Sequence, residues 1–213
     1  MHRTRIKICG ICRVEDALFA AQAGADAIGL IVYASSPRAV SIEGAAAIRR
    51  ALPAFVSTVA LLVDADRPAI DRIIGEVRPD LLQFHGAETA EFCNSFAIPY
   101  LKAMGVATGT TGSDLLKWQQ QYASASALLL DTSKDGKSGG TGTTFDWSLI
   151  PAEMRGGIVL AGGLNPANVG AAVRAVRPWA VDVSSGVEAE VGRKDHAKIA
   201  AFIDQVRLAD ANV

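Results

Sequence analysis

Short apolar runs alternate along the chain with longer segments in which apolar residues recur every three or four positions. The first pattern is typical of buried strands and the second of amphipathic helices. Strands are predicted at 6–9, 27–32, 57–63, 81–84, 100–103, 127–130, 158–161 and 180–183. Helices are predicted at 14–23, 42–51 with Ser41 as N-cap, 68–77 with Asp66 as N-cap, 90–96, 114–122, weakly at 146–150, after Asn165 or Asn168, and at 195–208.

The alternation amounts to eight strand–helix units without a linker or a break in composition. Strict alternation predicts a parallel sheet, and eight units favour a closed (β/α)8 TIM barrel, an α/β fold in which residues 1–213 form a single domain. An open doubly wound sheet is the alternative, although it usually has five or six strands. In a barrel of this kind, chemistry is expected where strands end and loops begin.

Composition and charge narrow the class of protein further. The net charge is −1, which argues against a nucleic-acid or membrane-surface partner. No apolar run approaches the roughly 18 residues of a membrane span, and the N-terminal residues lack a signal-peptide core. Three cysteines, at positions 9, 12 and 93, make no disulfide framework. A cytoplasmic location is therefore expected.

Two glycine-containing turns follow the last two predicted strands. The first is Gly162-Gly163 within IVLAGGLNPANV, and a short second turn, with Ser185-Gly186, follows the strand at 180–183. Glycine lets backbone approach a ligand closely, and free N–H groups at a helix start attract anions. Because the two strands are expected to be neighbours, the two turns together predict a phosphate site.

Two reactive side chains follow predicted strands. Cys9 ends the first strand, and Asp131 follows the sixth. An ionised thiol can act as a base, and a carboxyl group partly removed from water favours its protonated form. Other interpretations remain open at this point. Cys9 could be a small buried residue or half of a redox or metal-binding pair with Cys12, and Asp131 could cap the loop that follows it.

Side-chain alternation along the strands adds further candidates. The positions predicted to point inward are Lys7, Cys9, Gln83, His85, Asp182 and Ser184. In a closed barrel the last strand lies beside the first, so an ion pair between Lys7 and Asp182 is expected. Arg38, in the loop after the second strand, is either a surface arginine or a fork for a substrate carboxylate.

Six ordered stretches resemble the phosphoribosylanthranilate isomerase family of tryptophan biosynthesis over nearly the whole chain. They are KICGI at 7–11, SPR at 36–38, LQFHG at 82–86, GGTGTTFDW at 139–147, LAGGLNPANV at 160–169 and VDVSSGVE at 181–188. Cys12 departs from the family pattern, in which threonine is expected.

The resemblance implies an Amadori rearrangement of N-(5-phosphoribosyl)anthranilate to 1-(2-carboxyphenylamino)-1-deoxyribulose 5-phosphate. It assigns the general acid to Asp131 and the general base to Cys9, with possible help from the Lys7 ammonium. It assigns substrate binding to Arg38, Gln83, His85 and Asp182, and phosphate binding to Gly162, Gly163, Ser185 and Gly186. It implies no cofactor and no metal, a small phosphosugar substrate, and a monomer or homodimer.

Three alternatives remain at this stage. One is another phosphosugar barrel such as indole-3-glycerol-phosphate synthase, in which an N-terminal extension and a catalytic lysine at the mouth are expected. The others are a Cys9/Cys12 redox or metal-binding module and a non-catalytic phosphosugar-binding barrel. The glycine-rich loop at 132–144 is predicted to be a lid over the substrate, with Gly142 N–H adding to the phosphate site.

Overall fold

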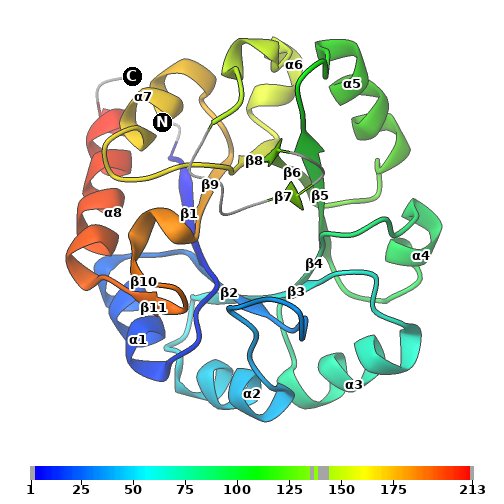
Figure 1. The fold of residues 1–213 in the computed structure, drawn as a ribbon, viewed down its shortest axis with the longest axis vertical. Helices are drawn as coiled ribbons and strands as arrows, with labels where there is room; N and C mark the ends of the chain where they lie inside the picture. The colour runs from blue at the N-terminus through cyan, green and yellow to red at the C-terminus, as the bar shows by residue number, and fades with distance from the viewer. Residues whose placement is uncertain (1–2, 135–136, 139–143, 212–213) are drawn as a thin grey trace.

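Eight parallel strands close into a ring in the computed structural model, which describes residues 3–134, 137–138 and 144–211 (Figure 1). They are β1 (Arg5–Cys9), β2 (Ala27–Ile31), β3 (Ser57–Leu62), β4 (Leu81–Phe84), β5 (Tyr100–Val106), β6 (Ala127–Lys134), β8 (Ile158–Leu160) and β9 (Ala180–Val183). Each strand pairs with the next in this order, and β9 pairs with β1. The predicted barrel is confirmed, and the open doubly wound sheet is wrong.

The helices surround the ring (Figure 1). They are α1 (Val14–Ala23), α2 (Ile42–Ala51), α3 (Arg67–Val77), α4 (Ala90–Asn94), α5 (Gly112–Gln121), α6 (Ala152–Arg155), α7 (Val169–Val176) and α8 (His196–Ala211), with 3-10 turns at Trp147–Leu149 and Ser185–Val187. The weak helix expected at 146–150 is only the first of these turns. Among the described residues, no helix is long and apolar enough to cross a membrane.

Three short strands lie outside the ring. β7 (Lys137–Ser138) pairs antiparallel with the end of β6, and β10 (Glu188–Glu190) pairs antiparallel with β11 (Arg193–Lys194). The β10–β11 hairpin follows β9 after the 3-10 turn at Ser185–Val187 and lies near α1 and α8 (Figure 1). It therefore brings the chain back beside the mouth of the barrel before α8 begins.

Alternation along the strands produces two apolar cores. On β6, Leu128 and Leu130 pack outward in the large core between the ring and the helices. Leu129, between them, packs inside the barrel with residues such as Ala103 and Val159. Because side chains alternate with a period of two, Asp131 lies on the same inward face as Leu129. The burial pattern of the strands therefore decides which polar residues face the mouth.

Most predicted boundaries are confirmed to within a few residues, and two local predictions need correction. β6 does not end at Asp131: its pairing with β5 continues through Gly105–Asp131 and Val106–Thr132, so both strands run on toward the mouth. Asn168 occupies the N-cap position of α7 without capping it. Its Oδ1 accepts a bond from the N–H of Asn165 instead, at 2.8 Å, and so stabilises the loop before the helix.

Candidate active site

Lys7, Cys9 and Asp182 form the β1 and β9 side of the barrel mouth. Lys7 lies opposite Asp182 in the register of the two strands, and its Nζ is 3.0 Å from Asp182 Oδ1. The predicted ion pair is therefore confirmed, with both side chains buried. Cys9 lies above this pair at the end of β1, and Gly29 on β2 makes room for it, because a Cβ at Gly29 would lie 2.7 Å from Cys9 Sγ.

The ionisation of Cys9 is set by two opposing effects. Burial raises the pKa of the thiol above its ordinary value of 9.0, and the Lys7 ammonium opposes that rise without outweighing it. Burial alone would lower the pKa of Lys7, but Asp182 and Cys9 together raise it above 10.5. Lys7 is thus a cation near Cys9 at neutral pH, where Cys9 is mainly a thiol.

Asp131 reaches the same mouth from β6 and contacts His85, which follows β4. His85 Nε2 lies 3.5 Å from Asp131 Oδ2, and Gln83 Nε2 lies 3.0 Å from His85 Nδ1. If the Gln83 amide donates to Nδ1, the imidazole proton is on Nε2 and faces the carboxyl group. Asp131 Oδ1 is buried and has no hydrogen-bond partner among the described residues. This carboxyl oxygen is therefore removed from water without a hydrogen bond from the described part of the chain to replace it.

A buried ion pair between Lys102 and Glu88 stabilises the turn that carries His85. Lys102 Nζ on β5 lies 2.8 Å from Glu88 Oε2 and donates to the Gly86 carbonyl at 2.6 Å. Glu88 in turn accepts from the N–H groups of Gly86 and Asp64, at 2.9 and 2.8 Å. These contacts fix the backbone beside His85. Neither Lys102 nor Glu88 was identified from the sequence, in which both look like ordinary surface charges.

The two glycine turns touch each other at the ends of β8 and β9. Gly162 and Gly163 have φ values of 82° and 63°, which glycine adopts without strain. A Cβ at Gly186 would lie 1.9 Å from the Leu164 carbonyl, so the second turn packs directly on the first. No acceptor among the described residues takes the N–H groups of Gly162 and Gly163. The first turn therefore has N–H groups without an acceptor among the described residues, close to the second turn.

The first glycine turn also adjoins Asp131. A Cβ at Gly162 would lie 2.9 Å from Asp131 Oδ1 and 2.3 Å from the backbone nitrogen of Thr132. The carboxyl oxygen without a partner is thus next to the turn proposed for phosphate. A ligand held by that turn would extend over the mouth between Asp131 and Cys9.

Arg38 lies at the mouth, but Glu188 occupies one edge of its guanidinium. Nε and Nη2 donate to the two Glu188 carboxylate oxygens at 2.7 and 2.8 Å. Glu188, at the start of β10, is also bound by Lys194 of β11 at 3.0 Å. Sequence analysis missed both residues as site residues. Both lie far from Arg38 in the sequence, and nothing local pointed to that contact.

Cys12 does not share the environment of Cys9. All three cysteines are free thiols, and Cys12 Sγ lies 3.4 Å from the Arg38 carbonyl. Within the described ranges, no group of three His, Cys, Asp or Glu side chains could hold a metal ion. Most of the loop at 132–144, including Gly136, Gly139, Gly140 and Gly142, lies outside the described residues, and the lid stays a prediction.

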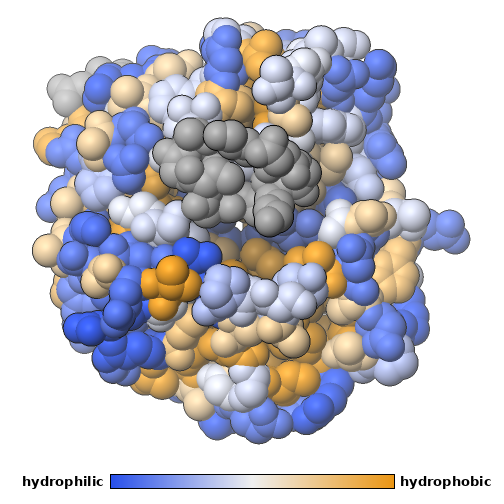
Figure 2. Space-filling view, in the orientation of Figure 1, coloured by the Kyte–Doolittle hydropathy of each residue, from blue (hydrophilic) through white to orange (hydrophobic). Residues whose placement is uncertain are grey.

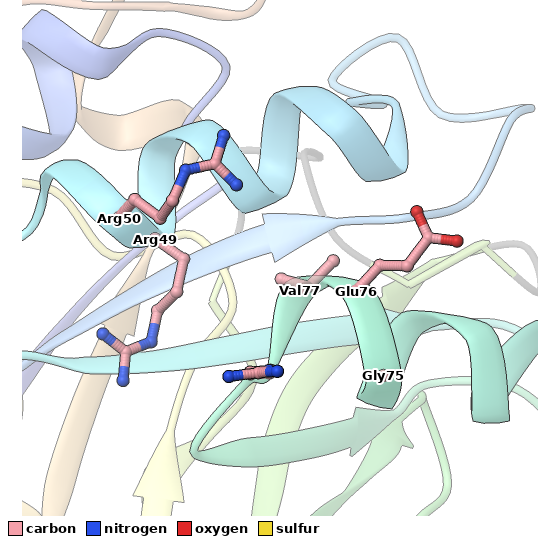
Figure 3. Close-up of a pocket in the computed structure, with 6 residues that line it drawn as sticks. Arg49, Arg50, Gly75, Glu76 and Val77 are labelled. Carbon is pink, nitrogen blue, oxygen red and sulfur yellow. The ribbon is translucent and has the colours of Figure 1, made fainter.

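Two hollows in the surface differ in their relation to this mouth. One, of about 400 Å³, is formed by the segments after β5 and β6, including Thr108, Thr132 and Phe145, and adjoins the site. The other, of about 420 Å³, lies at the C-terminal ends of α2 and α3 and includes Arg49 and Arg78 (Figure 3). Arginines at helix C-termini favour the negative end of the helix dipole, and Arg49 also pairs with Asp80. This second hollow has no contact with the site.

On the face shown in Figure 2, hydrophilic residues gather on the side formed by β10, β11 and α1. This is the side on which the Glu188 and Lys194 contacts lie. The mouth is therefore asymmetric: a charged hairpin borders β1, while His85 and Asp131 project from the strands farther around the ring.

Comparison with known proteins agrees with this geometry. Residues 6–205 match the model of the family described as N-(5'phosphoribosyl)anthranilate (PRA) isomerase. The N-(5'-phosphoribosyl)anthranilate isomerase of Pseudomonas aeruginosa (strain UCBPP-PA14) is 56% identical over 207 residues, which cover 97% of each chain. The match argues against the alternatives considered from the sequence, which were another phosphosugar barrel, a Cys9/Cys12 redox or metal-binding module and a non-catalytic phosphosugar-binding barrel.

Solved structures give the same result. The phosphoribosyl anthranilate isomerase of Thermotoga maritima is 42% identical with a TM-score of 0.86, covering 96% of this chain and 98% of that one. A second crystal structure of such an isomerase, in complex with reduced 1-(o-carboxyphenylamino)-1-deoxyribulose 5-phosphate, is 41% identical with a TM-score of 0.83 and the same coverage. This chain belongs to the phosphoribosylanthranilate isomerase family.

Proposed function

We propose that this isomerase rearranges N-(5-phosphoribosyl)anthranilate with Asp131 as general acid and Cys9 as general base. The observation that carries the assignment is the Asp131 carboxyl group, which is buried at the mouth with one oxygen lacking a partner among the described residues. The product analogue bound by the solved relative at 41% identity supports the substrate class. Cys9 supplies the second ionisable group at the end of β1, which β8 and β9 separate from β6 in the ring.

Two side chains of the protein move protons in the reaction. Asp131 gives its proton to the ribose ring oxygen, the bond between that oxygen and C1 breaks, and a Schiff base forms at C1. The Cys9 thiolate then takes the proton from C2 and becomes a thiol, and the electrons of the broken C–H bond neutralise the Schiff base to give an enolamine. In the last step C1 gains a proton and the 2-hydroxyl group loses one, so the C2 ketone forms and the number of protons is unchanged. The overall change is an isomerisation without net oxidation or reduction. Each positioned transfer is typically worth ~10²–10⁴ in rate.

The order of the steps explains how a thiol with a raised pKa can serve as the base. The free enzyme holds Cys9 mainly as a thiol because burial outweighs the effect of Lys7. The Schiff base is a cation next to the C2 proton, and a nearby positive charge favours the thiolate. The second step is therefore helped by the charge that the first step creates. Lys7 adds to this effect from below.

The remaining residues bind the two ends of the substrate. Gly162, Gly163, Ser185 and Gly186 bind the phosphate through N–H groups, which the contact between the two turns supports. Gln83, His85 and Asp182 line the sugar pocket, supported by the Gln83–His85 contact and the inward position of Asp182. Arg38 binds the anthranilate carboxylate at the opposite end.

We also propose that residues 1–213 act as one catalytic domain in the cytoplasm, as a monomer or homodimer. Three free thiols support a reducing compartment. A solved relative from Thermotoga maritima, 38% identical, is described as a dimeric enzyme from which monomers were generated. Either assembly is compatible with a site built from one chain.

The test follows loss of substrate fluorescence with purified Asp131→Asn and Cys9→Ser variants. Both substitutions keep side-chain size while removing or weakening the proton-transfer group. Each is expected to lower kcat by at least ~10². Cys12→Ser is the matched control and should retain most of the activity, because Cys12 contacts backbone carbonyls rather than the centre of the mouth.

Near-normal turnover of either variant would remove that residue from the mechanism. Equal damage from Cys9→Ser and Cys12→Ser would instead favour a role for the pair of thiols. No consumption of phosphoribosylanthranilate by the unaltered protein would refute the proposed reaction as a whole.

A further inference from the structure

The Arg38 guanidinium is held by one carboxylate and still has one edge free. Glu188 accepts bonds from Nε and Nη2, and the side chains of Arg38 and Glu188 are only 16% and 6% exposed. An arginine has five N–H donors arranged along two edges that each fit a carboxylate. Within the described part of the chain, nothing accepts from Nη1 or from the second N–H of Nη2. A second carboxylate could therefore bind end-on without displacing Glu188.

Glu188 itself is fixed by the hairpin in which it lies. Lys194 is its partner in the β10–β11 register, and Lys194 Nζ donates to Glu188 Oε1 and to the Ser184 carbonyl, both at 3.0 Å. The Lys194 side chain is fully buried. Lys198 on α8 donates to the Glu188 backbone carbonyl at 2.8 Å. The carboxylate thus has little freedom to turn away from Arg38.

Contacts behind the hairpin tie it to the outer helices. Asp16 on α1 accepts from the Lys194 backbone N–H at 3.2 Å, and its other oxygen lies 3.0 Å from His196 Nε2 on α8. The His196 ring stacks on Phe19 of α1, with centroids 4.0 Å apart. The position of the Arg38 guanidinium is therefore set by a continuous series of contacts that reaches the outside of the barrel.

The stem of Arg38 crosses the mouth beside Cys9. A Cβ at Gly10, the residue after Cys9, would lie 2.8 Å from Arg38 Cδ and 2.8 Å from Ser184 Oγ. Arg38 is therefore packed between the end of β1 and the turn after β9. The anthranilate end of a substrate held over Cys9 would lie within reach of this guanidinium, whereas the phosphate end occupies the glycine turns.

Charge favours an anion at this place. The three side chains in direct contact, Arg38, Glu188 and Lys194, carry two positive charges and one negative charge. Burial lowers the pKa of Lys194, Glu188 opposes that change, and Arg38 adds to it. The cluster thus carries one positive charge in excess in a largely water-free position. One carboxylate from a ligand would neutralise it.

We infer that Glu188 is a positioning residue that presents the free edge of Arg38 to the carboxylate of the substrate's aromatic amine and so determines specificity for an anionic ring. The inference rests on the proposed function of Arg38. Glu188 does not touch the reacting atoms. It acts by keeping the guanidinium in one orientation, so that less conformational freedom is lost when the carboxylate binds.

The experiment compares Glu188→Gln, Glu188→Asp and Arg38→Lys, with Glu190→Gln as the matched control. Glu190 lies on the same short strand but is exposed, and among the described residues its side chain pairs only with Arg193. Steady-state kinetics give KM and kcat, and competitive inhibition is measured with two probes. Anthranilate reports the carboxylate end of the site, and inorganic phosphate reports the glycine turns. Thermal unfolding of every variant shows whether the fold is retained.

Glu188→Gln is expected to raise KM and the anthranilate inhibition constant by at least about tenfold, with kcat within about threefold and phosphate inhibition unchanged. Glu188→Asp keeps the charge but is one methylene shorter, so its KM should lie between the KM of the unaltered protein and that of Glu188→Gln. Adding Glu188→Gln to Arg38→Lys should cause little further loss, since the two residues act through one contact. If Glu188→Gln fails to fold, the Glu188→Asp and Glu190→Gln comparison carries the same test.

Three results would overturn the inference, and the second of them also overturns the proposed function of Arg38. If Arg38→Lys raises KM while the Glu188 variants match Glu190→Gln, Glu188 does not position Arg38, although the proposed function stands. If Arg38→Lys leaves KM and anthranilate inhibition unchanged, the carboxylate site in the proposed function is wrong and the inference falls with it. A uniform loss of kcat in the Glu188 variants with unchanged KM would also refute a positioning role.

Discussion

Replacing Lys7 with methionine is expected to destabilise the protein by about 3–5 kcal/mol, because it leaves the Asp182 carboxylate buried without its ion-pair partner. Lys7 Nζ and Asp182 Oδ1 are 3.0 Å apart, with side chains 5% and 9% exposed. Two unit charges at 3.0 Å attract by roughly 5–6 kcal/mol at an effective dielectric constant of about 20. The expected loss is smaller than this attraction because the protein can relax around the remaining charge.

The loss should be visible as a large shift in unfolding temperature. For a protein of this size, each kcal/mol corresponds to about 2–4 °C, so the shift should be roughly 6–20 °C. At neutral pH the measurement includes the whole stabilisation by the Lys7–Asp182 ion pair. The folded pKa of Lys7 is raised above 10.5, so its stabilisation is fully present below that pH and is lost only as pH rises through the folded value.

The assay is urea denaturation of Lys7→Met, with Lys117→Met as control. Lys117 pairs with Asp114 at 3.3 Å on the surface, with its side chain 71% exposed, and such pairs are worth about 0–1 kcal/mol. A double variant, Lys7→Met with Asp182→Leu, should recover most of the lost stability, because an apolar pair of similar volume replaces the ion pair. A loss from Lys7→Met no larger than that of the control would refute the reasoning. So would a double variant that is less stable than the single one.

Alkylation by iodoacetamide should inactivate the enzyme through Cys9, and a reduced product analogue should slow the inactivation. The rate of inactivation should still increase with pH at pH 9, because burial raises the pKa of the Cys9 thiol above 9.0. A rate that reaches a plateau below pH 8 would contradict the ionisation argument. Gly162→Ala should lower stability by at least about 1–2 kcal/mol, since its φ of 82° is unfavourable for alanine. The same variant should weaken inhibition by inorganic phosphate, and unchanged inhibition would remove the Gly162 turn from the phosphate site.

Much of the fold followed from local patterns. The strand at 81–84 and the helix at 14–23 were predicted with the bounds that the structure has, because an apolar run or a helical spacing depends only on nearby residues. The caps Ser41 and Asp66 accept bonds from the N–H groups of Gly44 and Ala69, as expected from the same kind of signal. The inward positions of Lys7 and Asp182 followed from alternation once the strands had been assigned.

Local patterns did not predict the end of a strand where pairing with a neighbouring strand extends it. β5 and β6 extend to Val106 and Lys134, past the ends predicted from their apolar runs. Pairing between the two strands continues from Met104–Leu130 to Val106–Thr132, and Ser133 and Lys134 of β6 pair with β7 instead. Asp131 therefore lies within a strand rather than in a loop. Its sequence neighbours carry no sign of this.

The sequence by itself determined the eight-unit barrel, the face on which chemistry would gather, and the residue types at the strand ends. It could not determine which charged groups meet. Glu188 is 150 positions from Arg38, and Glu88, in the loop after β4, is 14 positions from Lys102 on β5. Only the tertiary structure decided these pairs, because ring closure and the path of the β10–β11 hairpin set distances that no local pattern of hydrophobic and polar residues contains.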